Sequence, residues 1–270
     1  MTNNIHPTAV IDKEATLGKN VKVGPFCVIA KNVVLEDNVE LKSHVFISEN
    51  VSIGEGTVVY PFASIGCDPQ NLKYKEEKSL TIIGKNNIIR EHVTIHTGTE
   101  SGIMKTLIGD NCFIMVGSHI AHDCVVGNNV IMANNATLGG HVVIEDFVVL
   151  GGLTAIHQFV RIGECSMIGG MSGIKYDIPP FSMVVAPEPN INGINVVGLK
   201  RQGFLKKDIT VLKQSYDMLF NKTCTLSEAI NSIESEFASS EVVRRLVKFM
   251  RSKSIRGVRK PNHCYDKAKV

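Results

Sequence analysis

The sequence contains no uninterrupted apolar run long enough to cross a membrane, and its first residues show no basic segment followed by an apolar one. We therefore expect neither a membrane span nor a secretory leader. The seven cysteines are scattered along the chain and never form a Cys-x-x-Cys pair. This spacing argues against a zinc ribbon and against a disulfide framework, and it favours reduced thiols in a cytoplasmic protein.

The net charge of +3 conceals an asymmetry along the chain. Residues 1–189 contain 13 Lys/Arg and 19 Asp/Glu, a balance of −6, whereas residues 190–270 contain 16 and 7, a balance of +9. A basic segment attached to an acidic body indicates an acidic partner, which would be a nucleic acid, an anionic lipid or an acidic protein. A solvated helical surface explains the same charge equally well.

A six-residue period is the strongest pattern in the chain. An aliphatic residue or methionine recurs at every sixth position over 5–65, 83–95 and 108–168, and glycine often follows it. Neither a 3.6-residue helix nor a heptad produces this period, whereas a triangular coil of three short strands does. The pattern predicts a parallel β-helix over residues 5–173 with a core of stacked aliphatic ladders. We expect the glycines to supply corner dihedrals that a Cβ disfavours.

The same period places polar residues on the surface of the predicted prism. With three six-residue units per coil, one column contains the units that begin at Ile65, Ile95, Ile120, Leu138 and Ile156. This requires the two interruptions to bulge outwards as loops at about 71–82 and 101–107. Both loops and five histidines then lie along a single edge, which indicates a functional site because rigid scaffolds commonly carry function on such loops. The five histidines are His96, His119, His122, His141 and His157.

A histidine cluster supports two kinds of chemistry. Neutral imidazoles bind zinc, as they would in a carbonic-anhydrase-like lyase with three histidines. Alternatively, one histidine acts as a general base on a hydroxyl acceptor. The segment 119–123 favours the base, because an aspartate directly after His122 can fix its tautomer and stabilise the imidazolium. A β-helix that binds a ligand without catalysis is a third hypothesis.

The six-residue period stops after residue 173, and prolines between 179 and 189 mark the exit from the coil. From Lys206 onward the apolar residues follow a helical period, and Thr225 with Glu228 fits a capping box. We therefore expect two domains, a β-helix over 1–190 and a C-terminal α-helical domain over 191–270. The helical domain would recognise an acidic carrier protein, close the open end of the prism, or do both.

Four segments of the chain are similar to a known family. They are IHTGT at 95–99, GSHIAHDCVVGNNVIMANNATLGGH at 117–141, GGLTAIHQF at 151–159 and INVVGLKRQGF at 194–204. They resemble the acyl-carrier-protein–UDP-N-acetylglucosamine O-acyltransferases of lipid A biosynthesis, which belong to the hexapeptide-repeat acyltransferase superfamily. The resemblance implies a left-handed coil and a homotrimer with clefts between neighbouring prisms. It also implies transfer of a 3-hydroxyacyl chain from acyl carrier protein to the 3-position of UDP-N-acetylglucosamine, without a metal or another cofactor.

The resemblance further implies roles for individual residues. His122 would be the general base, Asp123 would orient it, and the N–H of Gly140 would stabilise the oxyanion. Residues expected to line the cleft are His96, His119, His141, His157 and Gln158. Residues expected to contact the sugar or the nucleotide are Gln70, Asn71, Lys73, Asn195 and Arg201. Residues expected to measure the acyl chain are Met167 and Gly170.

Three positions depart from the pattern of the family. Asn71 stands where an aspartate is common, Val197 where a glutamate is common, and Gln202 where a second arginine is common. An amide at position 71 can hydrogen-bond to a hydroxyl or to an amine, so a 3-amino analogue of the sugar nucleotide is an alternative acceptor. The other two changes remove polar contacts expected to hold the nucleotide.

Overall fold

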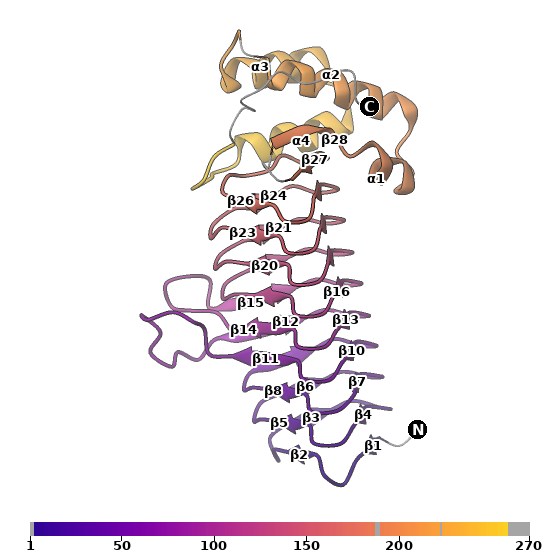
Figure 1. Ribbon diagram of the computed structural model, residues 1–270, viewed down its shortest axis with the longest axis vertical. Helices are drawn as coiled ribbons and strands as arrows, with labels where there is room; N and C mark the ends of the chain where they lie inside the picture. The colour runs from indigo at the N-terminus through magenta and orange to yellow at the C-terminus, as the bar shows by residue number, and fades with distance from the viewer. Residues whose placement is uncertain (1–2, 187–189, 222, 259–270) are drawn as a thin grey trace.

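The computed structural model describes residues 3–186, 190–221 and 223–258. They form a three-sided prism of short strands, with four helices at its C-terminal end (Figure 1). Neighbouring strands of each face come from successive coils, because each strand from β1 to β26 pairs in parallel with the third strand before or after it in the chain. At the C-terminal end, β27 pairs with β25 and then with β28, which is antiparallel to it. This arrangement is the predicted parallel β-helix.

The three faces are sheets of 11, nine and eight strands. The first face contains, in spatial order, β1 (Asn4–Ile5), β4 (Lys22–Val23), β7 (Glu40–Leu41), β10 (Val58–Val59), β13 (Ile88–Ile89), β16 (Phe113–Ile114), β19 (Ile131–Met132), β22 (Val149–Leu150), β25 (Met167–Ile168), β27 (Ser182–Val185) and β28 (Asn190–Ile194). The second contains β2 (Val10–Ile11), β5 (Val28–Ile29), β8 (Phe46–Ile47), β11 (Ser64–Cys67), β14 (Thr94–His96), β17 (His119–Ile120), β20 (Thr137–Leu138), β23 (Ala155–Ile156) and β26 (Gly173–Ile174). The third contains β3 (Thr16–Leu17), β6 (Val34–Leu35), β9 (Val51–Ile53), β12 (Leu80–Ile83), β15 (Lys105–Ile108), β18 (Val125–Val126), β21 (Val143–Ile144) and β24 (Arg161–Ile162).

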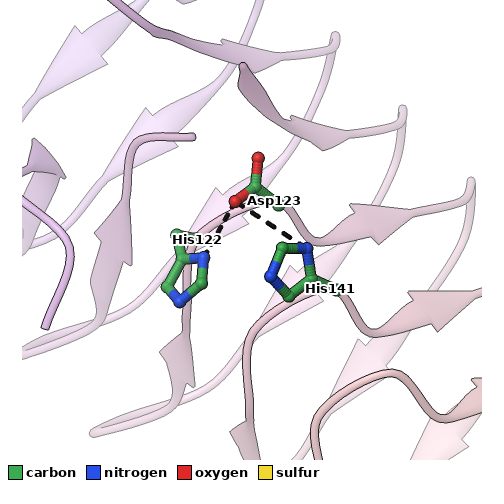
Figure 2. A group of neighbouring side chains, drawn as sticks. All are labelled: His122, Asp123 and His141. Atoms are coloured by element: carbon green, nitrogen blue, oxygen red, sulfur yellow. Dashed lines mark hydrogen bonds and ion pairs between the residues drawn. The ribbon is translucent and has the colours of Figure 1, made fainter. Parts of the chain in front are cut away.

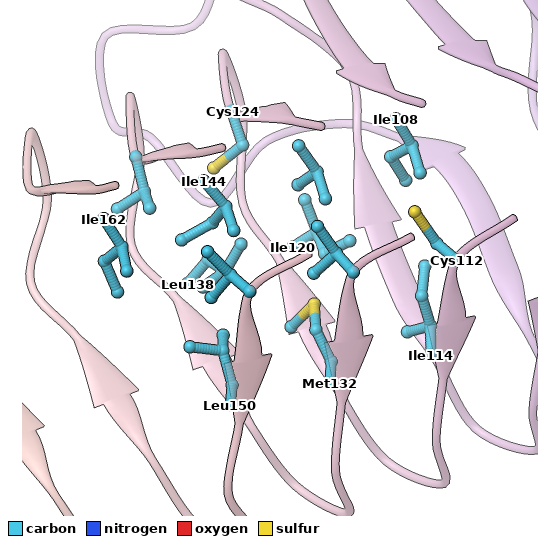
Figure 3. Packing of buried hydrophobic residues seen from close by; sticks show 14 of the residues in the cluster. Ile108, Cys112, Ile114, Ile120, Cys124, Met132, Leu138, Ile144, Leu150 and Ile162 are labelled. Carbon is cyan, nitrogen blue, oxygen red and sulfur yellow. The ribbon is translucent and has the colours of Figure 1, made fainter. Parts of the chain in front are cut away.

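The periodic aliphatic residues form the core, as predicted. In Figure 3 the side chains of Ile114, Met132 and Leu150 follow one another along the first face, and all three are fully buried. Each buried side chain of this size contributes roughly 1.5–3 kcal/mol relative to exposure. Ile5 remains 36% exposed because no coil lies below the first one.

The corners differ from the prediction in one respect. The glycine that follows the aliphatic residue does not have a positive φ at most positions, Gly66 excepted. Its role is close approach between coils, because a Cβ on Gly24 would lie 1.4 Å from the carbonyl oxygen of Lys42. The left-handed dihedrals occur at the fourth position of each unit, where asparagine is common, as at Asn20 with φ of 58°. Asparagine tolerates this region better than most residues, so the expected role of the glycines was wrong.

Two long loops leave the prism at the same edge (Figure 1). They connect β11 to β12 and β14 to β15, and they span residues 68–79 and 97–104. Both end earlier than expected, because residues 80–82 and 105–107 are already strand and β12 pairs with β15 along four residues. Thr81 and Thr106 are fully buried there, as alternate residues of a strand that face the core should be. The coil itself continues past residue 173, since β26 pairs with β23 and Ile174 is buried.

Four helices close the C-terminal end of the prism. They are α1 (Val196–Arg201), α2 (Lys206–Leu219), α3 (Leu226–Glu236) and α4 (Glu241–Arg251). The capping box predicted at Thr225 and Glu228 begins α3. Tyr216 of α2 is buried, and its hydroxyl donates to the carbonyl of Pro180 at the exit from the coil. None of the described helices combines the length and apolar composition that a membrane span requires.

Candidate active site

The strands of the second face pair in the register that the sequence predicted. The successive Cα partners are Ile65 with Ile95, Ile95 with Ile120, Ile120 with Leu138, and Leu138 with Ile156. The polar residues that follow these positions therefore stack along one edge of the prism, beside the two loops.

His122, Asp123 and His141 form the centre of this edge (Figure 2). The Nδ1 atom of His122 lies 2.8 Å from Oδ2 of Asp123, and Nδ1 of His141 lies 3.9 Å from the same oxygen. The two imidazole rings meet edge to face, with centroids 4.9 Å apart. The carboxylate has no exposed surface, whereas His122 and His141 keep 14% and 17% of their side-chain surface. The two histidines are therefore partly open to solvent, whereas the aspartate lies on their buried side.

The second loop holds the carboxylate of Asp123 in place. Its Oδ1 accepts the N–H groups of Thr99 at 3.1 Å and Ile103 at 2.9 Å, and its Oδ2 accepts the hydroxyl of Thr99 at 2.6 Å. Burial alone would raise the pKa of Asp123, but the hydrogen bonds from His122, Thr99 and Ile103 outweigh it and leave that pKa below its usual value. The loop also needs Gly102, because a Cβ there would lie 2.2 Å from the carboxyl carbon.

The same three side chains are the one group within the described residues whose ligand atoms lie close enough together to hold a metal ion. An ionised carboxylate offers about four acceptor positions. In Asp123 these four acceptor positions receive four hydrogen bonds: one from the ring of His122, one from the N–H of Ile103, and two from the N–H and the hydroxyl of Thr99. A metal would have to displace one of these donors, so the geometry favours a base supported by a carboxylate over a zinc site.

His96 and His119 form a second histidine pair below the first. Their ring centroids are 4.8 Å apart, and Nδ1 of His119 lies 2.7 Å from the hydroxyl of Thr94. Burial and the neighbouring His119 and His122 lower the pKa of His96 to about 4. Burial, followed by the charge that His122 can carry, also lowers the pKa of His119. Among the described residues the buried Nδ1 of His96 has no hydrogen-bond partner, so it is available to a ligand.

Gly140 lies directly against the ring of His122. A Cβ on this residue would be 2.6 Å from Cε1 and 2.7 Å from Nε2 of the imidazole. The carbonyl of Gly140 accepts the N–H of Phe159, whereas its own N–H has no acceptor within the described residues. A free N–H on a residue that packs against this ring is available to donate to an oxyanion that forms next to it.

Burial lowers the pKa of His141 more than the charge of Asp123 raises it. The ring of His141 stacks on Phe159, with centroids 4.4 Å apart. His157 and Gln158 continue the same edge further towards the helices, where both are exposed. All the predicted histidines of the edge therefore lie on one strip of surface.

The remaining predicted residues lie at other places. Gln70, Asn71 and Lys73 belong to the first loop, where Oδ1 of Asn71 accepts the N–H of Lys73 at 3.0 Å. Met167 is in β25 of the first face, and Gly170 packs against the carbonyl of Gly152.

Asn195 and Arg201 are at the two ends of α1, which Figure 1 shows on the side of the prism away from the loops. Asn195 is largely committed to structure, because its amide caps α1 at Gly198 and donates to the carbonyl of Cys165. Val197 and Gln202 are exposed on the same helix. Within one chain, α1 therefore does not join the histidine cluster.

Sequence reasoning missed two residues that the structure connects to the site. Thr99 lies within the IHTGT segment, but nothing in the pattern shows that it donates twice to Asp123. Arg256, which lies after the last helix, donates to Nδ1 of His157 at 2.7 Å. Its only sequence signal is the basic charge of the C-terminal segment.

Comparison with known proteins agrees with this geometry. A family model described as UDP N-acetylglucosamine O-acyltransferase, domain 2, matches residues 177–259, and a bacterial transferase hexapeptide model matches residues 14–49 and 105–140. A relative from Thermodesulfovibrio yellowstonii, named acyl-[acyl-carrier-protein]–UDP-N-acetylglucosamine O-acyltransferase, is 46% identical over 92% of this chain and 96% of its own length. A protein of the same name from Bartonella tribocorum is 48% identical over 98% of both chains.

Solved structures show the same relationship. The UDP-N-acetylglucosamine acyltransferase of Francisella novicida superposes with a TM-score of 0.93 at 40% identity, over 96% of this chain and 95% of that one. The enzyme of the same name from Campylobacter jejuni gives 0.89 at 41% identity, over 96% and 100%. The β-helix is accordingly of the left-handed hexapeptide type. This chain belongs to the UDP-N-acetylglucosamine O-acyltransferase family, and it is an acyltransferase.

Proposed function

We propose that the protein transfers a 3-hydroxyacyl chain from acyl carrier protein to the 3-hydroxyl of UDP-N-acetylglucosamine, the first step of lipid A biosynthesis, with His122 as the general base. The observation that carries this proposal is the 2.8 Å contact between His122 and the fully buried Asp123. The names of the relatives supply the two substrates. An acyl carrier protein donor would place the reaction in the cytoplasm.

The proposed mechanism follows from which nitrogen of His122 already makes a hydrogen bond and which is free. Asp123 accepts the Nδ1–H of His122, which leaves the lone pair of Nε2 free to take the proton of the acceptor hydroxyl. The hydroxyl oxygen attacks the thioester carbon, and the N–H of Gly140 donates to the oxyanion of the tetrahedral intermediate. When the intermediate collapses, the carbon–sulfur bond breaks and the imidazolium returns its proton to the departing thiolate of the carrier. Asp123, whose pKa is lowered, stays ionised and stabilises the imidazolium throughout.

The remaining histidines suit binding of a polar sugar. The pKa values of His96, His119 and His141 are all lowered, mainly by burial. These rings are therefore neutral near pH 7. His96 and His141 each offer one donor and one acceptor to hydroxyl and amide groups, whereas His119 offers only Nε2, because its Nδ1 is bonded to Thr94.

The hydrogen bond that the side chain of Asn71 already makes indicates which sugar nucleotide accepts the acyl group. Its Oδ1 already accepts the N–H of Lys73, which leaves Nδ2 as a donor. A donor pairs with the lone pairs of a hydroxyl and would oppose an ammonium group. We therefore propose the 3-hydroxyl as the acceptor, with the 3-amino analogue as the alternative.

A homotrimer would complete the proposed site. Asn195 and Arg201 lie away from His122 within one chain, so a neighbouring chain would have to bring them to the nucleotide. The N-terminal half of the prism also exposes large apolar residues that an interface would cover. They include Val10 at 63%, Phe26 at 56% and Phe62 at 52% exposed. Light scattering coupled to size-exclusion chromatography tests this, and a monomeric active enzyme would contradict it.

The helical end and the first face would position the acyl donor. Arg244 and Arg251 of α4 are more than 45% exposed, and each pairs with an exposed glutamate, Glu241 or Glu234. An acidic carrier protein would compete with these glutamates for the two guanidinium groups. Met167 and Gly170 would measure the acyl chain, and a glycine at position 170, which carries no side chain, suits a longer chain than a bulky residue would. Competition between carrier thioesters of different lengths tests this assignment.

The central test replaces His122 with alanine. We expect acyl transfer to fall by at least about 10²-fold while thermal unfolding and assembly stay unchanged, because the side chain is at the surface of the cluster. Activity within a few-fold of wild type would refute the role of His122. The same assay, offered UDP-N-acetylglucosamine and its 3-amino analogue, identifies the acceptor. Metal analysis completes the test, because stoichiometric zinc that is lost with His122 would favour a zinc enzyme instead.

A further inference from the structure

The last described segment, residues 252–258, extends the edge that carries the histidines. We call it the C-terminal strap. Figure 1 shows it in yellow, descending from α4 on the side of the prism from which the loops project. The N–H of Asp177 donates to the carbonyl of Gly257 at 2.8 Å, and Asp177 forms a parallel bridge with Val258. Asp177 occupies the corner position that Asp123 and His141 occupy in earlier coils, so the strap adds a layer to the same edge.

The path of the strap is fixed by a buried carboxylate. Oδ2 of Asp177, a residue only 1% exposed, accepts Nε of Arg161 at 2.7 Å and the hydroxyl of Ser254 at 2.6 Å. The same hydroxyl accepts the N–H of Gly257 at 2.7 Å. Bonds to a buried ionised group are among the stronger hydrogen bonds in proteins, so they hold the strap at a defined place.

Arg256 connects this strap to the histidine edge. Its Nε donates to the carbonyl of Gln158 at 2.9 Å, and its Nη2 lies 2.7 Å from Nδ1 of His157. A guanidinium can only donate, so Nδ1 of His157 is the acceptor in this contact. The same Nδ1 lies 3.3 Å from the carbonyl of Gln158, a contact that would need a proton on Nδ1, and the much shorter bond from Arg256 excludes that tautomer. The ring proton of neutral His157 is therefore on Nε2, and Nε2–H is left as a donor for a ligand.

The distance along the edge from His122 to Arg256 indicates which part of the substrate lies beside Arg256. Gln158 occupies the same position of its coil as His122, two coils further on, which corresponds to about 10 Å at the spacing of strands in a sheet. In a nucleotide sugar the diphosphate is a few bonds from the 3-hydroxyl. The phosphate of an acyl carrier lies much further from the thioester, at the end of the pantetheine arm. A cation at this distance suits the diphosphate.

We infer that Arg256 is a positioning residue for the diphosphate of the nucleotide substrate, and that it acts by holding His157 with Nε2–H as the donor. This inference rests on the proposed function. Two of the five guanidinium N–H groups are used by Gln158 and His157, and the charge of Arg256 adds to the attraction for the phosphates.

The test measures binding of UDP alone to the full-length protein by calorimetry, and then the kinetics of transfer. We expect Arg256→Ala to weaken UDP binding about tenfold and to raise KM for the nucleotide sugar by a similar factor, as the loss of one charge-assisted bond predicts. The kcat and the KM for acyl carrier protein should stay within about twofold. Arg256→Lys should recover part of the loss, because an ammonium keeps the charge but not the two-pronged geometry.

Lys253 provides the matched control, because it is an exposed cation on the same strap. Lys253→Ala should leave UDP binding unchanged, and an equal effect of both variants would overturn the inference in favour of general charge. The double variant with His157→Ala should lose less affinity for UDP than the sum of the two single losses, because the part of each loss that acts through the contact between Arg256 and His157 is counted only once. Additive losses, or unchanged UDP binding in Arg256→Ala, would also overturn it. A wild-type protein that binds UDP in this Arg256-dependent way but transfers no acyl group would support the inference and contradict the proposed function.

Discussion

Replacing Asp123 with asparagine should inactivate the enzyme by reversing the hydrogen bond between this residue and His122. The two backbone donors of Thr99 and Ile103 both point at Oδ1 and cannot move away. Facing the new NH2 group towards them would leave buried donors unsatisfied, at a cost of about 1–3 kcal/mol each. At the Oδ2 position the NH2 meets the hydroxyl of Thr99, which can rotate, and the ring of His122, which can change its tautomer. The amide should therefore settle with NH2 towards His122.

This orientation disables the base. An NH2 group donates to Nδ1 of His122, so the ring proton moves to Nε2, the atom that should accept the proton of the acceptor hydroxyl. We expect kcat to fall by about 10³- to 10⁴-fold, equivalent to about 4–5.5 kcal/mol in the barrier. Thermal unfolding should change little, because the amide keeps the bonds to Thr99 and Ile103.

The assay is acyl transfer from acyl carrier protein to UDP-N-acetylglucosamine, together with ¹⁵N NMR of the ring of His122 to read its tautomer. Asp146→Asn is the matched control, because Asp146 also accepts a backbone N–H from the preceding coil, at 2.7 Å from Asn128, but lies on another edge. It should keep normal activity. An Asp123→Asn enzyme within tenfold of wild-type kcat, with Nδ1 of His122 still protonated, would refute the reasoning.

Three further predictions follow from packing and charge. Gly140→Ala should lower kcat by at least about tenfold, because its Cβ would lie 2.6 Å from the ring of His122, whereas Gly173→Ala, with nothing within 4 Å, should be silent in the same assay. His96 has a pKa lowered from 6.5 to about 4, so the unfolded chain binds a proton that the folded one rejects between these pH values. Stability should therefore fall by about 3 kcal/mol as the pH drops through this window, and urea unfolding of His96→Gln should show a weaker dependence. Ile120→Ala, in a fully buried rung, should cost about 2–5 kcal/mol by urea unfolding, and a cost below about 1 kcal/mol would contradict the stacked core.

The sequence period was enough to predict the coil and the edge on which the histidines lie. A residue every six positions must face the core, so the strand register followed from the aliphatic residues alone, and the place of His122 and His141 followed from the register. The period could not show why glycine recurs, because close approach between coils at Gly24 is a contact between residues far apart in the chain. It also could not extend into the loops, where Thr99 has no periodic neighbours.

The residues after the last helix are a clearer example of contacts that a sequence period cannot predict. Arg256 is separated from His157 by the whole helical domain, and only the buried Asp177 brings the strap back to the prism. In the structure α4 ends at Arg251, and helical periodicity contains no information about where the chain goes next. Such contacts depend on a few polar side chains and not on a repeated pattern.

Asp123, the proposed support of the base, is a corner residue of the repeat, and the second loop gives this corner a different role. At two other corners the side chain at the fourth position bonds to its counterpart in the next coil, as Asn20 does with Asn38 at 2.9 Å and Asn32 with Asn50 at 3.2 Å. Asp123 has the same left-handed dihedral, with φ of 59°, but its carboxylate turns to the donors of Thr99 and Ile103 and to His122. Without the loop this carboxylate would be solvated and would lose three of its four donors. The repeat therefore supplies a rigid corner, and the inserted loop makes that corner an ionised, buried support for a base.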